Sequence, residues 1–259
     1  MKKIFTYARY LFDYLKHGDL VSVLSAIKYV LNKTSHSSDR IIKTSTGTFF
    51  CRKNTNDFQF ANYYYEWGVK KYLLDHKNEY NVFIDGGACI GSYSVLLSGA
   101  GLRCIAFEPM KSNFDVLVKN LELNNLKSGV DCLQLGLGSA NFSTKFVFNP
   151  VNTGASRIIG PNETGDTDAE IRTFDSIYPS LKLKHDDHIL IKLDVEGMEP
   201  MALAGAENFI REFHNLTFVL EDKHSGEDSI KDTLNRFATF EYGIVDEFNI
   251  FAKKQDRNS

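Results

Sequence analysis

The sequence lacks a strong charge of either sign, a cysteine framework and a long hydrophobic run. Its 259 residues contain 30 Lys and Arg against 33 Asp and Glu, a balance that argues against broad electrostatic binding to nucleic acid. The four cysteines form no C-x-x-C pair and fit no zinc spacing, so we expect a reducing, cytoplasmic environment. Arg9 and Asp13 interrupt the apolar core that a signal peptide needs. The longest apolar stretch near the N-terminus, residues 20–27, is too short to cross a membrane.

Several catalytic signatures are also missing. The sequence contains no G-x-S-x-G, no G-x-x-x-x-G-K-[ST] and no H-E-x-x-H, which counts against a serine hydrolase, a P-loop enzyme and a zinc protease. We assign no metal site, because Asp194 and Glu196 alone are too few ligands to identify one. What is present is an ordinary globular composition, with 43% apolar and 24% charged residues. It suits one large domain with an extension, or two small domains.

From residue 81 onward, strand-like runs alternate with helical ones. This alternation predicts an α/β fold, in which a mostly parallel sheet has helices on both faces. The short turn between the last two strands requires that one of them runs antiparallel. Strands are expected at residues 81–85, 103–107, 130–135, 188–194, 216–221, 240–245 and 248–253, and helices after Gly91 and at 111–124, 199–211 and 228–238. Residues 141–175 are typical of a strand-loop-strand insertion beside the active face.

Two segments precede this core, which we assign to residues 81–259. Residues 1–39 are expected to form a helical extension, and residues 40–80 to cap the core. Their expected elements are helices at 4–16 and 20–31, a strand pair at 40–52 and an aromatic helix from Asp57 to about Asp75. The extension is basic, which indicates either peripheral contact with an anionic membrane or a partner, or a helical cap packed on the core. We favour the cap, because basic amphipathic patches are weak signals.

The most informative motif is Asp85-Gly86-Gly87-Ala88-Cys89-Ile90-Gly91, which follows an apolar strand and opens a helix. Its glycines let the backbone turn sharply and approach a ligand at the carboxyl ends of the strands. A dinucleotide site would need glycine in place of Ala88, and the Asp85 carboxylate would repel a pyrophosphate. S-adenosylmethionine is cationic and has no phosphate, so it fits better. A plain strand-to-helix turn is the alternative. The expected cofactor contacts are Asp85, Gly86, Gly87, Ala88 and Gly91.

Glu108 and Pro109 close the next strand, 17 residues after Gly91. An acid at about this distance binds ribose hydroxyls in nucleoside-binding sheets, and Pro109 holds Glu108 in an extended conformation. A solvated acid at a strand end is the alternative, but the neighbouring glycine loop favours a ribose contact. We therefore add Glu108 and Pro109 to the cofactor contacts.

A third motif, residues 191–199, delivers charged side chains at the end of a strand. Alternation puts Lys192 and Asp194 on one face, where a buried lysine needs a partner such as Asp194 or a nearby glutamate. Glu196 adds an acid beside a substrate or a metal, although an internal ion pair is the structural alternative. The catalytic candidates are Asp194, Glu221 and His224 as general bases, in that order, together with Lys192.

Four segments together resemble the FkbM-type methyltransferase family: VFIDGGACIGSYS (82–94), IAFEPMKSNFDVLVKNLELN (105–124), TFDSI (173–177) and IKLDVEGME (191–199). The resemblance covers roughly residues 50–225 and implies the class I, Rossmann-like methyltransferase fold with a seven-stranded sheet. It also implies cofactor contacts at Asp85, Gly87 and Gly91, a ribose contact at Glu108, and Asp194 with Glu196 at the reaction face. Family members often have Ala-Asn after the second glycine, where this sequence has Ala88-Cys89.

The expected activity is therefore S-adenosylmethionine-dependent methylation, with a hydroxyl of a sugar, a glycan or a similar natural product as the acceptor that the resemblance implies. We expect no nucleic acid partner and no transmembrane segment. A nicotinamide-dependent oxidoreductase on a similar sheet and a non-catalytic nucleoside-binding scaffold are the alternatives. Asp85 and Ala88 count against the oxidoreductase, and the complete set of acids at 85, 108 and 194 counts against the scaffold.

Overall fold

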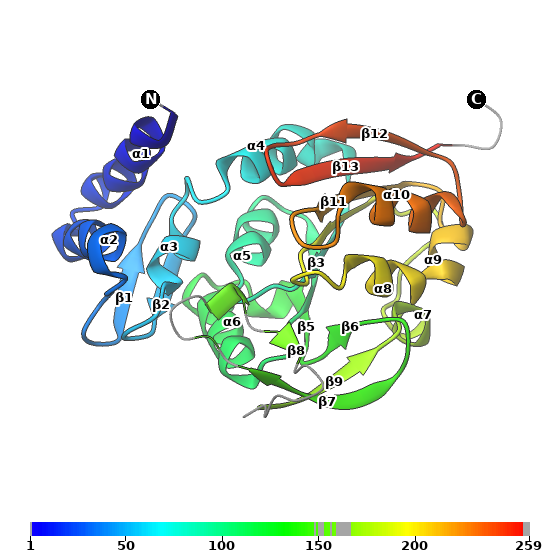
Figure 1. The fold of residues 1–259 in the computed structure, drawn as a ribbon, viewed down its shortest axis with the longest axis horizontal. Helices are drawn as coiled ribbons and strands as arrows, with labels where there is room; N and C mark the ends of the chain where they lie inside the picture. The colour runs from blue at the N-terminus through cyan, green and yellow to red at the C-terminus, as the bar shows by residue number, and fades with distance from the viewer. Residues whose placement is uncertain (1, 148, 150–152, 156, 159–166, 256–259) are drawn as a thin grey trace.

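The computed structural model describes residues 2–147, 149, 153–155, 157–158 and 167–255. Within them, seven strands form one sheet in the order β12-β13-β11-β10-β3-β4-β5 (Figure 1). They are β3 (Val82–Gly86), β4 (Arg103–Phe107), β5 (Val130–Leu133), β10 (Ile189–Leu193), β11 (Leu216–Glu221), β12 (Phe240–Ile244) and β13 (Asn249–Lys254). All neighbouring pairs are parallel except those that β13 makes with β11 and β12. The predicted sheet with one reversed strand is confirmed.

The central strands separate two hydrophobic cores, one on each face of the sheet. Val82 and Ile84 of β3 belong to one core, whereas Phe83 belongs to the other, because successive side chains of a strand point to opposite faces. Helices must then cover both faces. On the side of Phe83 lie α4 (Trp67–His76), α5 (Ser92–Gly99) and α6 (Lys111–Leu123), and on the side of Ile84 lie α7 (Phe174–Ile177), α8 (Glu199–Ala204), α9 (Glu207–Glu212) and α10 (Glu227–Asn235).

The order of the strands reverses between β3 and β10. β4 and β5 extend the sheet to one side of β3, and β10 and β11 extend it to the other. A sheet of this kind opens a crevice at the carboxyl ends of the strands on either side of the reversal. The Asp194 N–H donates to the Gly86 carbonyl at 3.0 Å, which holds the two strand ends together beneath that crevice.

A second, four-stranded sheet lies beside these strand ends, where the sequence indicates an insertion (Figure 1). Its order is β6-β9-β7-β8. The strands are β6 (Gly136–Leu137), β7 (Phe142–Val147), β8 (Arg157–Ile158) and β9 (Thr167–Arg172), and a short 3₁₀ helix, η3, covers Thr153–Ala155. The expected strands before and after the loop are β7 and β9. The remaining 3₁₀ turns are η1 (Lys77–Glu79), η2 (Lys127–Gly129) and η4 (Tyr178–Ser180).

The N-terminal segments match their predictions except at one helix. They contain α1 (Lys2–Lys16), α2 (Leu20–Asn32), the antiparallel pair β1 (Arg40–Lys43) and β2 (Thr48–Cys51), and α3 (Asp57–Ala61). The single helix predicted from Asp57 to Asp75 is wrong, because it is divided into α3 and α4. The Asn62 side chain accepts the N–H of Tyr64 at 2.9 Å, and such local side-chain bonds compete with helix formation. Glu66 then takes a left-handed conformation with φ of 48°.

The helix predicted at 199–211 is also divided, into α8 and α9. Gly205 stands at the break, and a Cβ atom there would lie 2.0 Å from the Gly138 carbonyl oxygen. The close approach of these two backbones therefore requires glycine at 205 and ends α8 there. None of the helices in the described part of the chain is long and apolar enough to span a bilayer.

Candidate functional site

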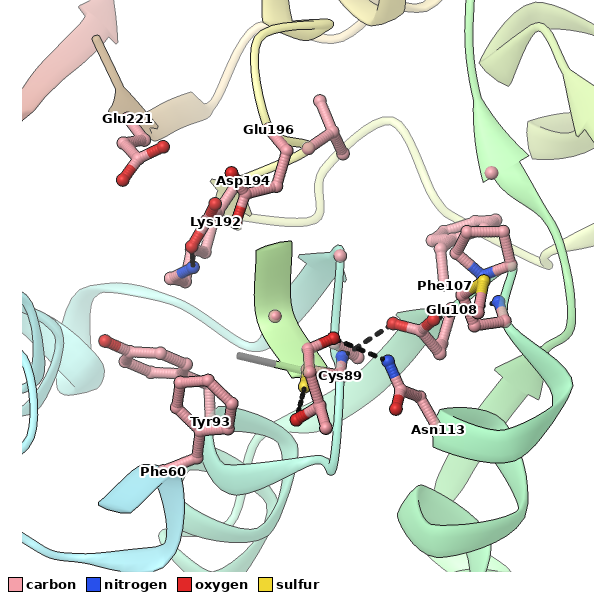
Figure 2. Close-up of a pocket in the computed structure, with 18 of the residues that line it drawn as sticks. Phe60, Cys89, Tyr93, Phe107, Glu108, Asn113, Lys192, Asp194, Glu196 and Glu221 are labelled. Carbon is pink, nitrogen blue, oxygen red and sulfur yellow. Dashed lines mark hydrogen bonds and ion pairs between the residues drawn. The ribbon is translucent and has the colours of Figure 1, made fainter. Parts of the chain in front are cut away.

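A cavity of about 490 Å³ opens at the carboxyl ends of β3, β4, β10 and β11. In Figure 2, Glu108 and Asn113 stand on one side of it, and Lys192, Asp194 and Glu221 stand on the other. Its wall also includes residues of the insertion and of the N-terminal segments. These are Leu137, Phe146, Thr153, Gly154 and Ile171 from the first, and Tyr10, Phe60, Tyr65 and Glu66 from the second. The expected site therefore coincides with a cavity that three parts of the chain build together.

The glycine loop forms the floor of this cavity. Gly87 has a φ of 85°, and a Cβ atom on it would lie 1.9 Å from the Asp194 carbonyl oxygen, so only glycine allows β3 and β10 to end so close together. Gly87 and Ala88 line the cavity, whereas Gly86 and Gly91 are not among its lining residues. The expected role of Gly91 changes accordingly: its φ of 83° and its close approach to Leu117 shape the start of α5.

The structure corrects the position of the Asp85 carboxylate. We expected it at the mouth of the strand, but Asp85 is fully buried and is not among the lining residues of the cavity. Its Oδ2 accepts the Ser94 hydroxyl of α5 at 2.6 Å. Burial raises its pKa, while the nearby Lys192 ammonium lowers it. The Asp85 carboxylate thus lies beneath the floor of the cavity, and its expected contact with the cofactor stays a prediction.

Glu108 lies at the edge of the cavity with its carboxylate fixed by backbone donors. The side chain is 4% exposed. Its two oxygens accept the N–H groups of Cys89 at 2.8 Å and of Met110 at 2.9 Å. Burial raises the pKa of Glu108 to about 7, against the lowering effect of these hydrogen bonds. Pro109 also lines the cavity, so both residues expected here are at its wall.

The loop under Glu108 is connected to the capping segment. Arg52 binds Asp57 through its Nε at 2.8 Å and Asn113 through an Nη2 donor at 2.9 Å. The Thr153 hydroxyl donates to Asp57 at 3.1 Å, and the Asn113 amide donates to the Thr153 carbonyl at 3.1 Å. This network joins β2, α3, α6 and the insertion next to the glutamate, so the wall on this side is rigidly supported.

On the opposite side, Lys192 and Asp194 form the ion pair that alternation predicts. The Lys192 Nζ lies 2.8 Å from the Asp194 Oδ2, and the lysine side chain is 3% exposed. Burial lowers the pKa of Lys192, but the carboxylates of Asp194, Glu66 and Asp85 more than offset this effect and raise it. Lys192 is therefore a permanent cation at neutral pH.

Three further acids follow the ends of β10 and β11. Burial, then the charges of Asp194 and Glu196, raise the pKa of Glu221 to about 8. The Oε2 of Glu221 is buried and makes no hydrogen bond among the described residues. Burial and the Asp194 charge raise the pKa of Glu196 to about 7, and Glu196 has a φ of 54°. Glu199 is occupied, because it accepts the Val195 N–H at 2.9 Å and the Ser225 hydroxyl at 2.6 Å.

His224 lies outside the cavity, unlike the other candidates for a base. It is not among the lining residues; its side chain is 43% exposed and its Nε2 lies 3.5 Å from the Glu196 Oε2. The structure also brings ligand atoms of Glu196, Glu221 and His224 within 4.8 Å of one another, as it does for Asp194, Glu199 and Glu221. Possible metal ligands at this edge of the sheet therefore include other residues besides Asp194 and Glu196.

Sequence reasoning missed Glu66, which stands on the side of the cavity that α3 and the residues between α3 and α4 provide. The Tyr93 hydroxyl donates to Glu66 at 2.5 Å, and Lys192 lies 4.7 Å from the centre of the Tyr93 ring. Phe60 and Tyr65 make an edge-to-face contact at 5.0 Å. The density of aromatic residues from 58 to 67 is the one signal that pointed to this wall, whereas nothing in the local sequence singles out Glu66.

The sheet and the position of the cavity define a class I methyltransferase fold. A methyltransferase from Agrobacterium tumefaciens, described as dependent on S-adenosylmethionine, has a similar fold, with a TM-score of 0.50, 9% identity, and coverage of 86% of this chain and 72% of that one. The FkbM protein of Methylobacillus flagellatus KT gives a TM-score of 0.48 at 18% identity, over 77% of this chain and 56% of that one.

Residues 85–243 match the FkbM methyltransferase domain, and the chain belongs to this family. Methyltransferase sdnD of Sordaria araneosa is 30% identical to it over 156 residues, which are 48% of this chain and 60% of the relative. The match thus spans about three fifths of the curated relative. The expected family is confirmed, and so is the expected cofactor, because FkbM methyltransferases use S-adenosylmethionine.

Proposed function

We propose that this chain is an S-adenosylmethionine-dependent O-methyltransferase whose acceptor is a hydroxyl of a sugar, a glycan or a similar natural product. One observation carries the proposal. One cavity has on one wall a carboxylate positioned by backbone donors, Glu108. On the facing wall it has a buried carboxylate oxygen, on Glu221, that has no hydrogen-bond partner among the described residues. The first arrangement suits a bound nucleoside and the second suits a proton acceptor.

The residues around the glycine loop fit the cofactor. Glu108 has lone pairs left to accept ribose hydroxyls after binding two N–H groups. Gly87 exposes backbone without a side chain. We assign Glu108, Pro109, Gly87 and Ala88 to the cofactor, with Gly86, Gly91 and Asp85 as supports of the loop.

The charge of the cavity also favours this cofactor. Five carboxylates line it, against two lysines, Lys192 and Lys223; the acids are Glu66, Glu108, Asp194, Glu196 and Glu221. Carboxylates that surround a partly buried site attract a sulfonium and an ammonium and repel a pyrophosphate. The electrostatic argument made for Asp85 therefore applies to lining acids instead, and it counts against a nicotinamide dinucleotide.

Glu221 is the general base in this proposal. When bound, the cofactor supplies the methyl group. The acceptor oxygen would take this methyl group from the cofactor's sulfur, and Glu221 would accept the proton that the hydroxyl gives up. A pKa of about 8 suits this task, because a base works best when its pKa lies near the working pH. Asp194 is already paired with Lys192, and His224 lies outside the cavity, so neither is the base in this proposal.

The acceptor would lie against the wall formed by Tyr10, Phe60, Tyr65 and Tyr93. Aromatic rings give flat apolar faces with polar groups at their edges. Together with Glu66, this wall matches a compact ring that carries several hydroxyls. Positioning the two reactants in one cavity can supply roughly 7–11 kcal/mol of the barrier reduction.

The test is calorimetric titration with S-adenosylmethionine, followed by detection of the demethylated cofactor when a glycan extract is added. We expect binding by the native chain and much weaker binding by Glu108→Ala. Glu122→Ala, an exposed position on α6, is the matched control and should bind normally. Binding of NAD without binding of S-adenosylmethionine would refute the proposal. Cofactor turnover that does not depend on the extract would refute the acceptor class.

A further inference from the structure

α2 is apolar on the face that it turns to solvent as well as on its inner face, where Val23, Ala26 and Tyr29 pack against the core. It buries Ser22 and Ser25, whereas Leu20, Leu24 and Leu31 are 63%, 56% and 78% exposed. These leucines are four and seven residues apart, so they share one face of the helix. Also exposed on α2 are Val21, Ile27 and Val30. A helix on a water-facing surface normally buries its apolar side chains, so α2 is matched to an apolar environment outside the chain.

Hydrogen bonds hold the serines inward. The Ser22 hydroxyl donates to the Asp19 carboxylate at 2.5 Å and lies 3.2 Å from the His36 ring nitrogen. Asp19 also accepts the Ser22 N–H as the N-cap of α2, and it binds Arg40 at 2.9 Å. The orientation of α2 is therefore fixed by polar contacts on its inner side, and the leucines cannot turn inward without breaking them.

α1 presents apolar side chains in the same way. Phe12 and Leu15 are 59% and 52% exposed, whereas Tyr14 is fully buried and its hydroxyl donates to the Phe58 carbonyl at 2.7 Å. Figure 1 shows α1 and α2 beside each other at one end of the molecule, away from the helices that cover the large sheet. We call the exposed apolar side chains of both helices, with Lys16 and Lys28 among them, the outer face.

The charge of this region differs from that of the remaining chain. Residues 1–33 contain six Lys and Arg and two Asp, whereas the other residues contain 24 Lys and Arg and 31 Asp and Glu. Both acids of the helical region are turned inward: Asp13 is fully buried and accepts the Ser45 and Tyr63 N–H groups, and Asp19 caps α2. Lys16 and Lys28 are exposed.

We propose that the outer face docks on the surface of an anionic lipid bilayer. When a helix lies in the plane of a membrane, its apolar side chains enter the acyl region and its lysines pair with the anionic headgroups. A second copy of the chain suits this face less well, because a symmetric contact would bring its lysines against each other. α1 also carries Tyr10 into the cavity, so docking places the acceptor wall next to the bilayer.

The test is sedimentation of the full chain with vesicles of phosphatidylcholine alone or of phosphatidylcholine with 30% phosphatidylglycerol, a composition chosen to give roughly the surface charge at which basic helices bind. We expect about tenfold stronger partitioning to the anionic vesicles, and a decrease as NaCl is added. The double variant Leu24→Ser, Leu31→Ser should lose most of the binding, and Lys28→Glu should reduce it several-fold.

Matched controls distinguish binding through the outer face from non-specific adsorption to vesicles. Ile244→Ser, at an 81% exposed position of β12, and Lys184→Glu, at an exposed lysine before β10, should bind as the native chain does. Circular dichroism verifies that every variant is folded, and light scattering measures the oligomeric state. No sedimentation, or equal sedimentation with both vesicles, would overturn the proposal, as would a dimer that Leu24→Ser dissociates. The readout does not depend on methyl transfer, so it stands apart from the proposed activity.

Discussion

The two walls of the cavity differ in how completely their polar groups are satisfied. On the wall at the end of β4, both oxygens of Glu108 accept backbone N–H groups and a network from Arg52 to Thr153 supports them. On the wall at the ends of β10 and β11, Glu221 retains a buried oxygen that finds no hydrogen-bond partner in the part of the chain that the structure describes. Non-glycine residues with positive φ angles stand on both walls, Cys89 beside Glu108 and Glu196 beside Glu221.

This difference indicates a division of labour. A wall whose groups are already fixed binds its ligand with little reorganisation, which is what a cofactor site needs. Carboxylates crowded together raise one another's pKa values and keep a proton acceptor reactive. Backbone strain at non-glycine residues persists where the surroundings enforce it, and such positions concentrate at functional sites. Variants that change cofactor binding and turnover separately therefore test whether the two walls have these different roles.

The largest expected effect is on turnover, at Glu221. Glu221→Gln preserves the shape but cannot accept the hydroxyl proton, so kcat should fall by about 10²- to 10⁴-fold. Calorimetry should give a cofactor Kd within about twofold of the native value. Asp222→Asn, which alters the next acid along the chain but not one that lines the cavity, should leave kcat nearly unchanged. If Glu221→Gln kept the native kcat, a group other than Glu221 would have to accept the hydroxyl proton.

The next effect is on cofactor affinity, at Glu108. Glu108→Gln replaces a charged acceptor of the ribose hydroxyls by a neutral amide with one acceptor oxygen, which weakens those hydrogen bonds by about 1.5–3 kcal/mol. The cofactor Kd should therefore rise roughly 10- to 150-fold, while kcat at saturating cofactor changes little. Glu122→Gln on α6 is the control. A large loss of kcat with unchanged affinity would reverse the roles of the two walls.

The third effect is a pH dependence that follows from Glu221. Its pKa is raised to about 8 by burial and by the charges of Asp194 and Glu196. Because the base must be deprotonated, kcat at saturating cofactor should rise about tenfold from pH 6 to pH 7 and level off above pH 8. In Glu221→Gln this slope should disappear from whatever activity remains. A native profile that is flat from pH 6 to pH 9 would contradict the assignment.

How much of this site the sequence predicts depends on the range of the interactions involved. Hydrophobic alternation and strand-ending motifs are local, so the sheet, the glycine loop and the Lys192–Asp194 pair were all predictable. The burial of Asp85 depends on Ser94 of α5 and on a neighbouring strand. The exposed outer side of α2 depends on hydrogen bonds to His36.

The wall around Glu66 was not predictable for the same reason. The break between α3 and α4 comes from Asn62, whose carbonyl oxygen accepts the Lys70 ammonium at 2.6 Å and whose side chain closes a turn. That turn places Glu66 opposite Tyr93, a residue of α5. Helical periodicity alone gives one long helix there, with no acid directed into a cavity.

The smallest effect tests this wall through Tyr93. Its hydroxyl donates to Glu66 at 2.5 Å, and its ring lies over Lys192. Tyr93→Phe keeps the ring and removes the donor, so the acceptor KM should rise about fivefold, equivalent to ~1 kcal/mol, with cofactor affinity unchanged. Tyr178→Phe removes an equally short bond to Glu212 outside the cavity and should leave KM unaltered. A change in cofactor Kd instead of acceptor KM would show that Glu66 serves the cofactor and that the two walls are not separate.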